Sequence, residues 1–80
     1  MPTVLLLGPY RFFFYANERG EPAHILVQRD AALATFWLAP IALARSCGFG
    51  APELTRLARI VDEHRDLSLE HWNERFGHRS

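Results

Sequence analysis

Four aromatic residues in a row, Phe12 to Tyr15, constrain the fold of this 80-residue chain more than any other feature. Successive side chains of a β-strand point to opposite faces of the sheet, so a half-buried strand alternates between apolar and polar residues. The stretch YRFFFYA, residues 10–16, instead places aromatic rings on both faces of one strand. It therefore predicts a sheet with one face in the core and a second face that is also partly apolar.

The composition is that of one small folded domain. A hydrophobic fraction of 49% supports a core and argues against disorder, and the formal net charge of zero provides no strong field for nucleic acid or membranes. The single cysteine, Cys47, cannot form an internal disulfide, which is typical of a reducing cytoplasm. No basic leader or apolar run of membrane-spanning length is present. We therefore expect a cytoplasmic protein with a single domain over residues 1–80 and no membrane association.

The first half of the chain, residues 1–38, predicts antiparallel strands. Aromatic and apolar runs alternate with turn residues at short intervals, which favours a β-meander of three to four strands. The expected strands cover residues 3–7, 10–16, 23–29 and 32–38.

The second half, residues 40–77, carries helix signals. Pro40 suits the first turn of a short helix over IALARSC, residues 41–47. Pro52 then opens a longer helix, in which apolar residues recur every three or four positions. A break near residues 66–70 is the alternative to one continuous helix. The expected fold class is therefore α+β, an antiparallel β-meander followed by one short and one long C-terminal helix.

The polar loop over residues 17–22 sets the register of the second and third strands. If Ala16 faces Ala23, two apolar pairs share the core face: Phe12–Val27 and Phe14–Ile25. Three further pairs then share the opposite face, which we call the outer face: Arg11–Gln28, Phe13–Leu26 and Tyr15–His24. A slip by one residue would mix the two sets and is disfavoured.

The outer face predicts a contact surface for another protein. Trp37 of the fourth strand joins it, together with Thr35, whereas Ala34, Phe36 and Leu38 are expected in the core. Two helices cannot easily cover both faces of such a sheet, so this face should stay available. Tyr, Trp and Arg are common anchors of protein interfaces. The predicted interface consists of Arg11, Phe13, Tyr15, His24, Leu26 and Trp37.

The same face leaves two nucleic-acid alternatives open. In a ribonuclease-type toxin, His24 would be the general acid or base, with Tyr15 and Arg11 stabilising phosphate charge. No second titratable group is visible near His24, so we favour the protein interface. Single-stranded RNA could also stack on the aromatic rings, although zero net charge weakens phosphate contacts.

The histidines do not predict a metal site. Two His at alternate positions of a strand could bind a metal, but Leu26 stands two residues after His24. His64, His71 and His78 follow one another at intervals of seven, which leaves about 10 Å between neighbours on a helix. We therefore expect no metal and no cofactor.

Three segments carry a resemblance to a known family: YRFFFYANERGEPAHILV, FWLAPIALARSCGF and EHRDLSLEHWNERFG. They resemble the short bacterial proteins called the domain of unknown function 4160 family, over essentially the whole chain. The resemblance implies no established activity. Members of the family are often encoded beside a second small protein, so the resemblance implies a layout similar to toxin–antitoxin pairs.

Three positions depart from the pattern of that family. Its members usually carry His at the position of Leu26, Lys at that of Thr35 and Asp at that of Ala39. If the family has a catalytic or metal site there, this chain has lost or weakened it. We therefore expect a small protein-interaction module, either a homodimer or one half of a toxin–antitoxin-like pair, with RNA binding or cleavage as the alternative.

Overall fold

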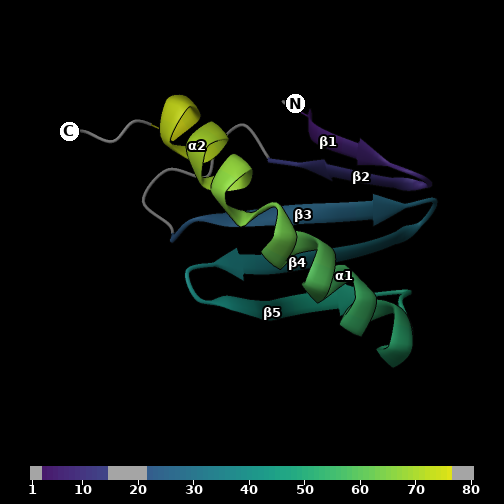
Figure 1. Ribbon diagram of the computed structural model, residues 1–80. Coiled ribbons are helices and arrows are strands. Elements are labelled where there is room, and N and C mark those ends of the chain that lie inside the picture. Colours follow the sequence, from purple (N-terminus) through teal and green to yellow (C-terminus); the bar gives the residue numbers. More distant parts are fainter. Residues whose placement is uncertain (1–2, 15–21, 77–80) are drawn as a thin grey trace.

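The computed structural model describes residues 3–14 and 22–76. Five antiparallel strands form one sheet in which neighbours along the chain are neighbours in space (Figure 1). The strands are β1 (Thr3–Leu7), β2 (Tyr10–Phe13), β3 (His24–Arg29), β4 (Ala32–Leu38) and β5 (Ile41–Cys47). Two helices follow, α1 (Ala51–Glu63) and α2 (Arg65–Phe76), and both lie across the same face of the sheet (Figure 1). The α+β class and the antiparallel meander are confirmed.

The predicted short helix over residues 41–47 is wrong, because this segment forms β5 and gives the sheet a fifth strand. Its Ala, Leu and Arg residues favour a helix only weakly, by tenths of a kcal/mol each. Strand β4 would otherwise present an unpaired edge, and its pairing with β5 from Leu38–Ile41 to Leu33–Cys47 satisfies those backbone groups. Pro40 lies in the turn between the two strands rather than in the first turn of a helix.

The predicted single long helix is also wrong, since the chain leaves the helical conformation at His64, with φ −111° and ψ 22°. Its ring Nδ1 donates a hydrogen bond to the carbonyl oxygen of Ile60 at 3.0 Å. The same carbonyl oxygen also accepts the backbone N–H of His64 at 3.1 Å, so both donors of His64 hold the end of α1. The break therefore precedes residues 66–70, the range expected for an interruption.

The core lies between the sheet and the two helices. Its buried members come from β2, β3, β4 and both helices: Phe12, Phe14, Ile25, Val27, Ala34, Phe36, Leu38, Leu57, Val61 and Trp72. Phe14 meets Trp72 edge to face, with ring centres 5.2 Å apart. This contact fixes α2 against the end of β2.

The predicted register of β2 and β3 is confirmed within the described residues. Three cross-strand pairs agree with the expected alignment: Arg11–Gln28, Phe12–Val27 and Phe13–Leu26. Phe13 and Leu26 consequently point away from the core that holds Phe12. The predicted pair of Tyr15 with His24 lies outside the described residues because it includes Tyr15.

A polar cluster joins the start of α1 to the sheet. The Arg29 guanidinium donates two hydrogen bonds to the Glu53 carboxylate, at 2.8 and 2.9 Å. The Tyr10 hydroxyl donates a third bond to the same carboxylate at 2.6 Å. The Arg29 guanidinium also lies over the ring of Phe49, 5.4 Å from its centre. Strands β2 and β3 are thereby tied to the first turn of α1.

Candidate interaction surface on the sheet

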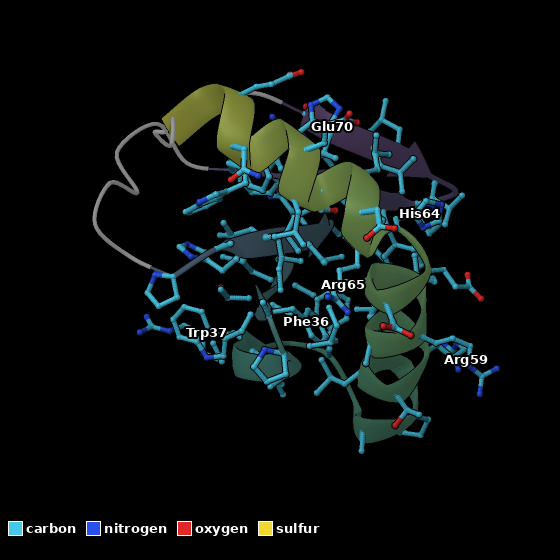
Figure 2. All side chains as sticks on the ribbon, turned by 60° about the vertical axis from the view of Figure 1, so that its left-hand side comes forward. Phe36, Trp37, Arg59, His64, Arg65 and Glu70 are labelled. Atoms are coloured by element: carbon cyan, nitrogen blue, oxygen red, sulfur yellow. The ribbon has the colours of Figure 1, made fainter. Side chains whose placement is uncertain are left out.

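The outer face is the side of the sheet that α1 and α2 leave uncovered. The strand registers place the same residues on it as the alternation of the sequence does. Figure 2 shows this alternation within β4, where Phe36 lies toward the helices and Trp37 away from them. The described members of the outer face are Thr3, Leu6, Arg11, Phe13, His24, Leu26, Gln28, Leu33, Thr35, Trp37, Ala42, Arg45 and Cys47.

Phe13 and Leu26 are less available than the sequence predicts. Their exposed fractions are 2% and 3%, so the chain itself already buries them. Part of this cover is the Arg11 guanidinium, whose carbon lies 4.6 Å from the centre of the Phe13 ring. The Arg11 side chain is held there by a hydrogen bond from Nε to the Thr3 hydroxyl at 3.1 Å. A partner would therefore meet Arg11 first and not the Phe13 ring.

His24 is also buried, with 4% of its surface exposed. Its ring Nδ1 donates a hydrogen bond to the Pro22 carbonyl oxygen at 2.9 Å. Two indoles pack on the imidazole, that of Trp37 at 5.5 Å and that of Trp72 at 5.0 Å between ring centres. Burial between two indoles leaves His24 poorly placed to exchange protons with a bound substrate. Tyr15, the third candidate of the ribonuclease hypothesis, lies outside the described residues.

The accessible part of the outer face surrounds Trp37. Trp37 and Thr35 are partly exposed on β4, and Arg45 is exposed on β5 directly opposite Thr35. Strands lie about 4.8 Å apart, so Arg11 and Arg45, three strands from each other, stand roughly 14 Å apart across the sheet. This patch of the surface combines the partly exposed ring of Trp37 with the Arg45 guanidinium on the neighbouring strand, and Arg11 lies at the opposite corner of the outer face.

Charge is divided unequally between the two layers. No acidic side chain is present among the described strand residues of the outer face, which carry Arg11 and Arg45. The helical segment, residues 51–76, contains six acidic and four basic residues in its sequence. The balanced total therefore conceals a positive sheet face and a negative helical layer, a division that the overall net charge could not reveal.

The cluster around Glu53 was missed by the sequence analysis. Hydrogen bonds from Arg29 and Tyr10 lower the pKa of Glu53 below its ordinary value, and the bond to Glu53 raises the pKa of Arg29. The partners are 24 and 43 residues away in the chain, so no local pattern pointed to them. The cluster faces α1, and its hydrogen bonds are made within the chain.

No group of three or more His, Cys, Asp or Glu in the described part of the chain could hold a metal ion. Two of the three departures from the family pattern prove to be neighbours, since Leu26 pairs directly with Thr35 across β3 and β4. Ala39 lies apart from them in the exposed turn before β5. Leu26 and Thr35 therefore place no charged side chain at the centre of the outer face.

The model of one family, described as Domain of unknown function (DUF4160), matches residues 10–73. The chain belongs to this family. The DUF4160 match runs from β2 into α2, and it begins after β1. No curated protein and no solved structure gives a match to the chain. Among the described helices of this DUF4160 protein, none has the length and apolar character needed to cross a membrane.

Proposed function

We propose that this DUF4160 protein is a small protein-binding module that receives an acidic partner protein on the outer face of its sheet. The partner would be the product of an adjacent gene, as in a toxin–antitoxin-like pair. The observation that carries the proposal is the outer face itself: it holds Trp37 with Arg45 on the neighbouring strand and Arg11 at the opposite corner, and neither described helix covers it (Figure 1).

The patch has the physical properties of a protein interface. Its backbone is fixed by hydrogen bonding to strands on both sides of β3 and β4, so binding costs little ordering of the main chain. Trp37 offers a large ring that is still partly exposed, and tryptophan and arginine are frequent anchors of binding energy. Phe13 and Leu26 support the patch from within rather than contacting the partner.

The charge of the patch favours an acidic partner. An arginine guanidinium can donate two parallel hydrogen bonds to one carboxylate, and Arg45 is exposed for such a contact. Since the described strand residues of this face include no Asp or Glu, an acidic partner would meet no like charge there. Charge complementarity of this kind also speeds association at low salt.

The proposal is tested by isothermal titration of the purified adjacent gene product into this protein. Arg45→Glu and Trp37→Ala should each weaken binding at least about tenfold, the loss expected for an interface anchor. The matched control is Arg59→Glu, the same charge reversal on α1, where Arg59 points away from the sheet (Figure 2). The control should bind within about twofold of the unchanged protein because it lies outside the interface. Unchanged binding by both outer-face variants, with folding verified by circular dichroism, would contradict the proposal.

Single-stranded RNA is the second candidate for the same face, because aromatic rings and arginines together suit stacking and phosphate contact. In a gel-shift titration, RNA binding would weaken steeply with salt and would fall in Arg45→Glu. A ribonuclease would additionally lose cleavage in His24→Ala. Absence of both a shift and cleavage would remove this candidate.

A further inference from the structure

We infer that the free edge of β1 pairs with β1 of a second copy of the chain, which makes a weak two-fold dimer with one continuous sheet. The inference concerns a different surface from the proposed function and does not depend on it. It starts from the position of β1, which pairs only with β2 and lies at one end of the sheet order. In Figure 1, no described strand lies beyond its outer edge, and α2 contacts β1 from the helical side of the sheet.

The side chains of β1 leave this edge unprotected. An unpaired strand edge is a template for another strand, and proteins usually guard it with charged residues or proline. The strand TVLLL contains neither. Leu6 and Leu7 are 71% and 38% exposed, and they are two of the three large hydrophobic side chains exposed in the described residues.

The opposite edge of the sheet provides a comparison. Strand β5 is also unpaired on one side, but Arg45 lies within it. Two-fold pairing of β5 with itself would bring Arg45 close to its own copy, and like charges across strands are destabilising. Both edge pairings contain one register shift, so irregularity does not distinguish them. The charge of Arg45 does distinguish them, and it favours self-pairing of β1 over self-pairing of β5.

The geometry of antiparallel pairing shows why a second copy of the chain fits the free edge of β1. A strand can pair antiparallel with its own copy about a two-fold axis, so each copy offers the same surface. With the axis at Leu6, beyond the irregularity between Thr3 and Leu5, Leu6 faces its own copy and Leu5 faces Leu7 of the second copy. Every such pair is uncharged, and backbone hydrogen bonds form across the axis. A second copy therefore fits without repulsion.

The size of the contact sets its strength. Five residues on each side give far less than the roughly 1,200 Å² of a standard interface. The dimer should therefore be weak and should appear only at high protein concentration. Because pairing continues the sheet, the helices of both copies lie on one side and both outer faces on the other.

Sedimentation velocity over about 1 µM to 1 mM protein tests the inference, a range that brackets weak association. The unchanged protein should pass from monomer to dimer as its concentration rises. Leu6→Lys should remain monomeric, because it places two like charges opposite each other at the axis. The matched control is Leu43→Lys on β5, where Leu43 is 44% exposed, and it should dimerise like the unchanged protein.

Amide hydrogen exchange identifies the edge that pairs. Backbone amides of β1 should exchange at least about fivefold more slowly at dimeric than at monomeric concentration, whereas those of β5 should not change. Arg45→Glu should leave the dimer intact, which separates this inference from the fate of the outer-face proposal. A monomer at every concentration, or dimerisation lost in Leu43→Lys but kept in Leu6→Lys, would overturn the inference.

Discussion

The guanidinium of Arg11 lies over the Phe13 ring and bonds to Thr3, so one residue provides both cover and charge on the outer face. The sequence shows that Arg11 and Phe13 share a strand, and their spacing predicts a shared face. It does not show that the long arginine side chain folds back over the ring. Exposure was therefore misjudged at Phe13 although the face was assigned correctly.

Replacing Arg11 by Ala should uncover Phe13. We expect the free energy of unfolding to fall by about 0.5–1 kcal/mol, the usual contribution of a cation over an aromatic ring near the surface. Urea denaturation measures this loss. Arg11→Lys is the control and should retain part of the stability, because it keeps the charge and the aliphatic stem. An Arg11→Ala protein as stable as the unchanged one would show that the contact contributes nothing.

Glu53 predicts a pH dependence of stability. Its carboxylate accepts hydrogen bonds from Arg29 and Tyr10, which lower its pKa below the ordinary value of 4.5. A carboxylate with a lowered pKa in the folded state stabilises the fold above its unfolded pKa, and this contribution is lost as the pH falls through the folded pKa. Stability should therefore decline below pH 4.5.

Denaturation of Glu53→Gln at pH 7 and at pH 3.5 or below checks this expectation, since the amide cannot titrate. The variant should be less stable than the unchanged protein at pH 7, and the difference should narrow in acid. A stability difference between Glu53→Gln and the unchanged protein that stays constant with pH would contradict a lowered pKa at Glu53.

Strand β4 forms over residues 32–38 as predicted, because alternating residues and flanking turns specify a strand locally. The stretch IALARSC contains no such alternation, and its individual residues favour a helix. It becomes β5 because β4 presents a complementary edge, which is information held elsewhere in the chain. The break at His64 was foreseen only as an alternative and a few residues too late in the chain, since the apolar spacing continues across it.

The connection from β5 to α1 depends on Gly48, whose φ is +91°. A Cβ there would lie 3.0 Å from Cβ and 3.1 Å from Cα of Ala32. Gly48→Ala should therefore lower the free energy of unfolding by about 2 kcal/mol, from backbone strain and the close contact together. Thermal and urea unfolding measure the loss.

Gly8→Ala is the matched control for Gly48→Ala. Gly8 also has a positive φ, of 58°, but a Cβ there would meet nothing within 4 Å. Its substitution should cost about 1 kcal/mol, the share due to strain alone. Equal losses in the two variants would show that the contact with Ala32 is relaxed without cost.

At the scale of the whole molecule, one core joins the sheet to both helices. Phe14, Leu57 and Trp72 belong to the same buried cluster although they come from distant parts of the chain. The sequence predicts most of the strand members of this cluster from their alternation. The outer face was likewise predicted as a set of residues, but its division into buried and accessible members depends on packing that no alternation encodes.

Phe14→Ala should destabilise the whole molecule by about 3–5 kcal/mol, because it removes a fully buried ring that packs on Trp72. Far-ultraviolet circular dichroism and tryptophan emission should report one shared transition, as expected for a single cooperative unit. Leu43→Ala, at a largely exposed position, is the control and should cost less than about 1 kcal/mol. Two separate transitions in the unchanged protein would contradict the single core.

The chain has two tryptophans, and both rest against the same imidazole of His24. One indole belongs to the open side of the sheet and the other to the layer beneath the helices. The molecule thus contains two natural fluorescent side chains that both contact the imidazole of His24. Trp37→Phe and Trp72→Phe would separate their signals, so events on each side of the sheet could be followed without any added label.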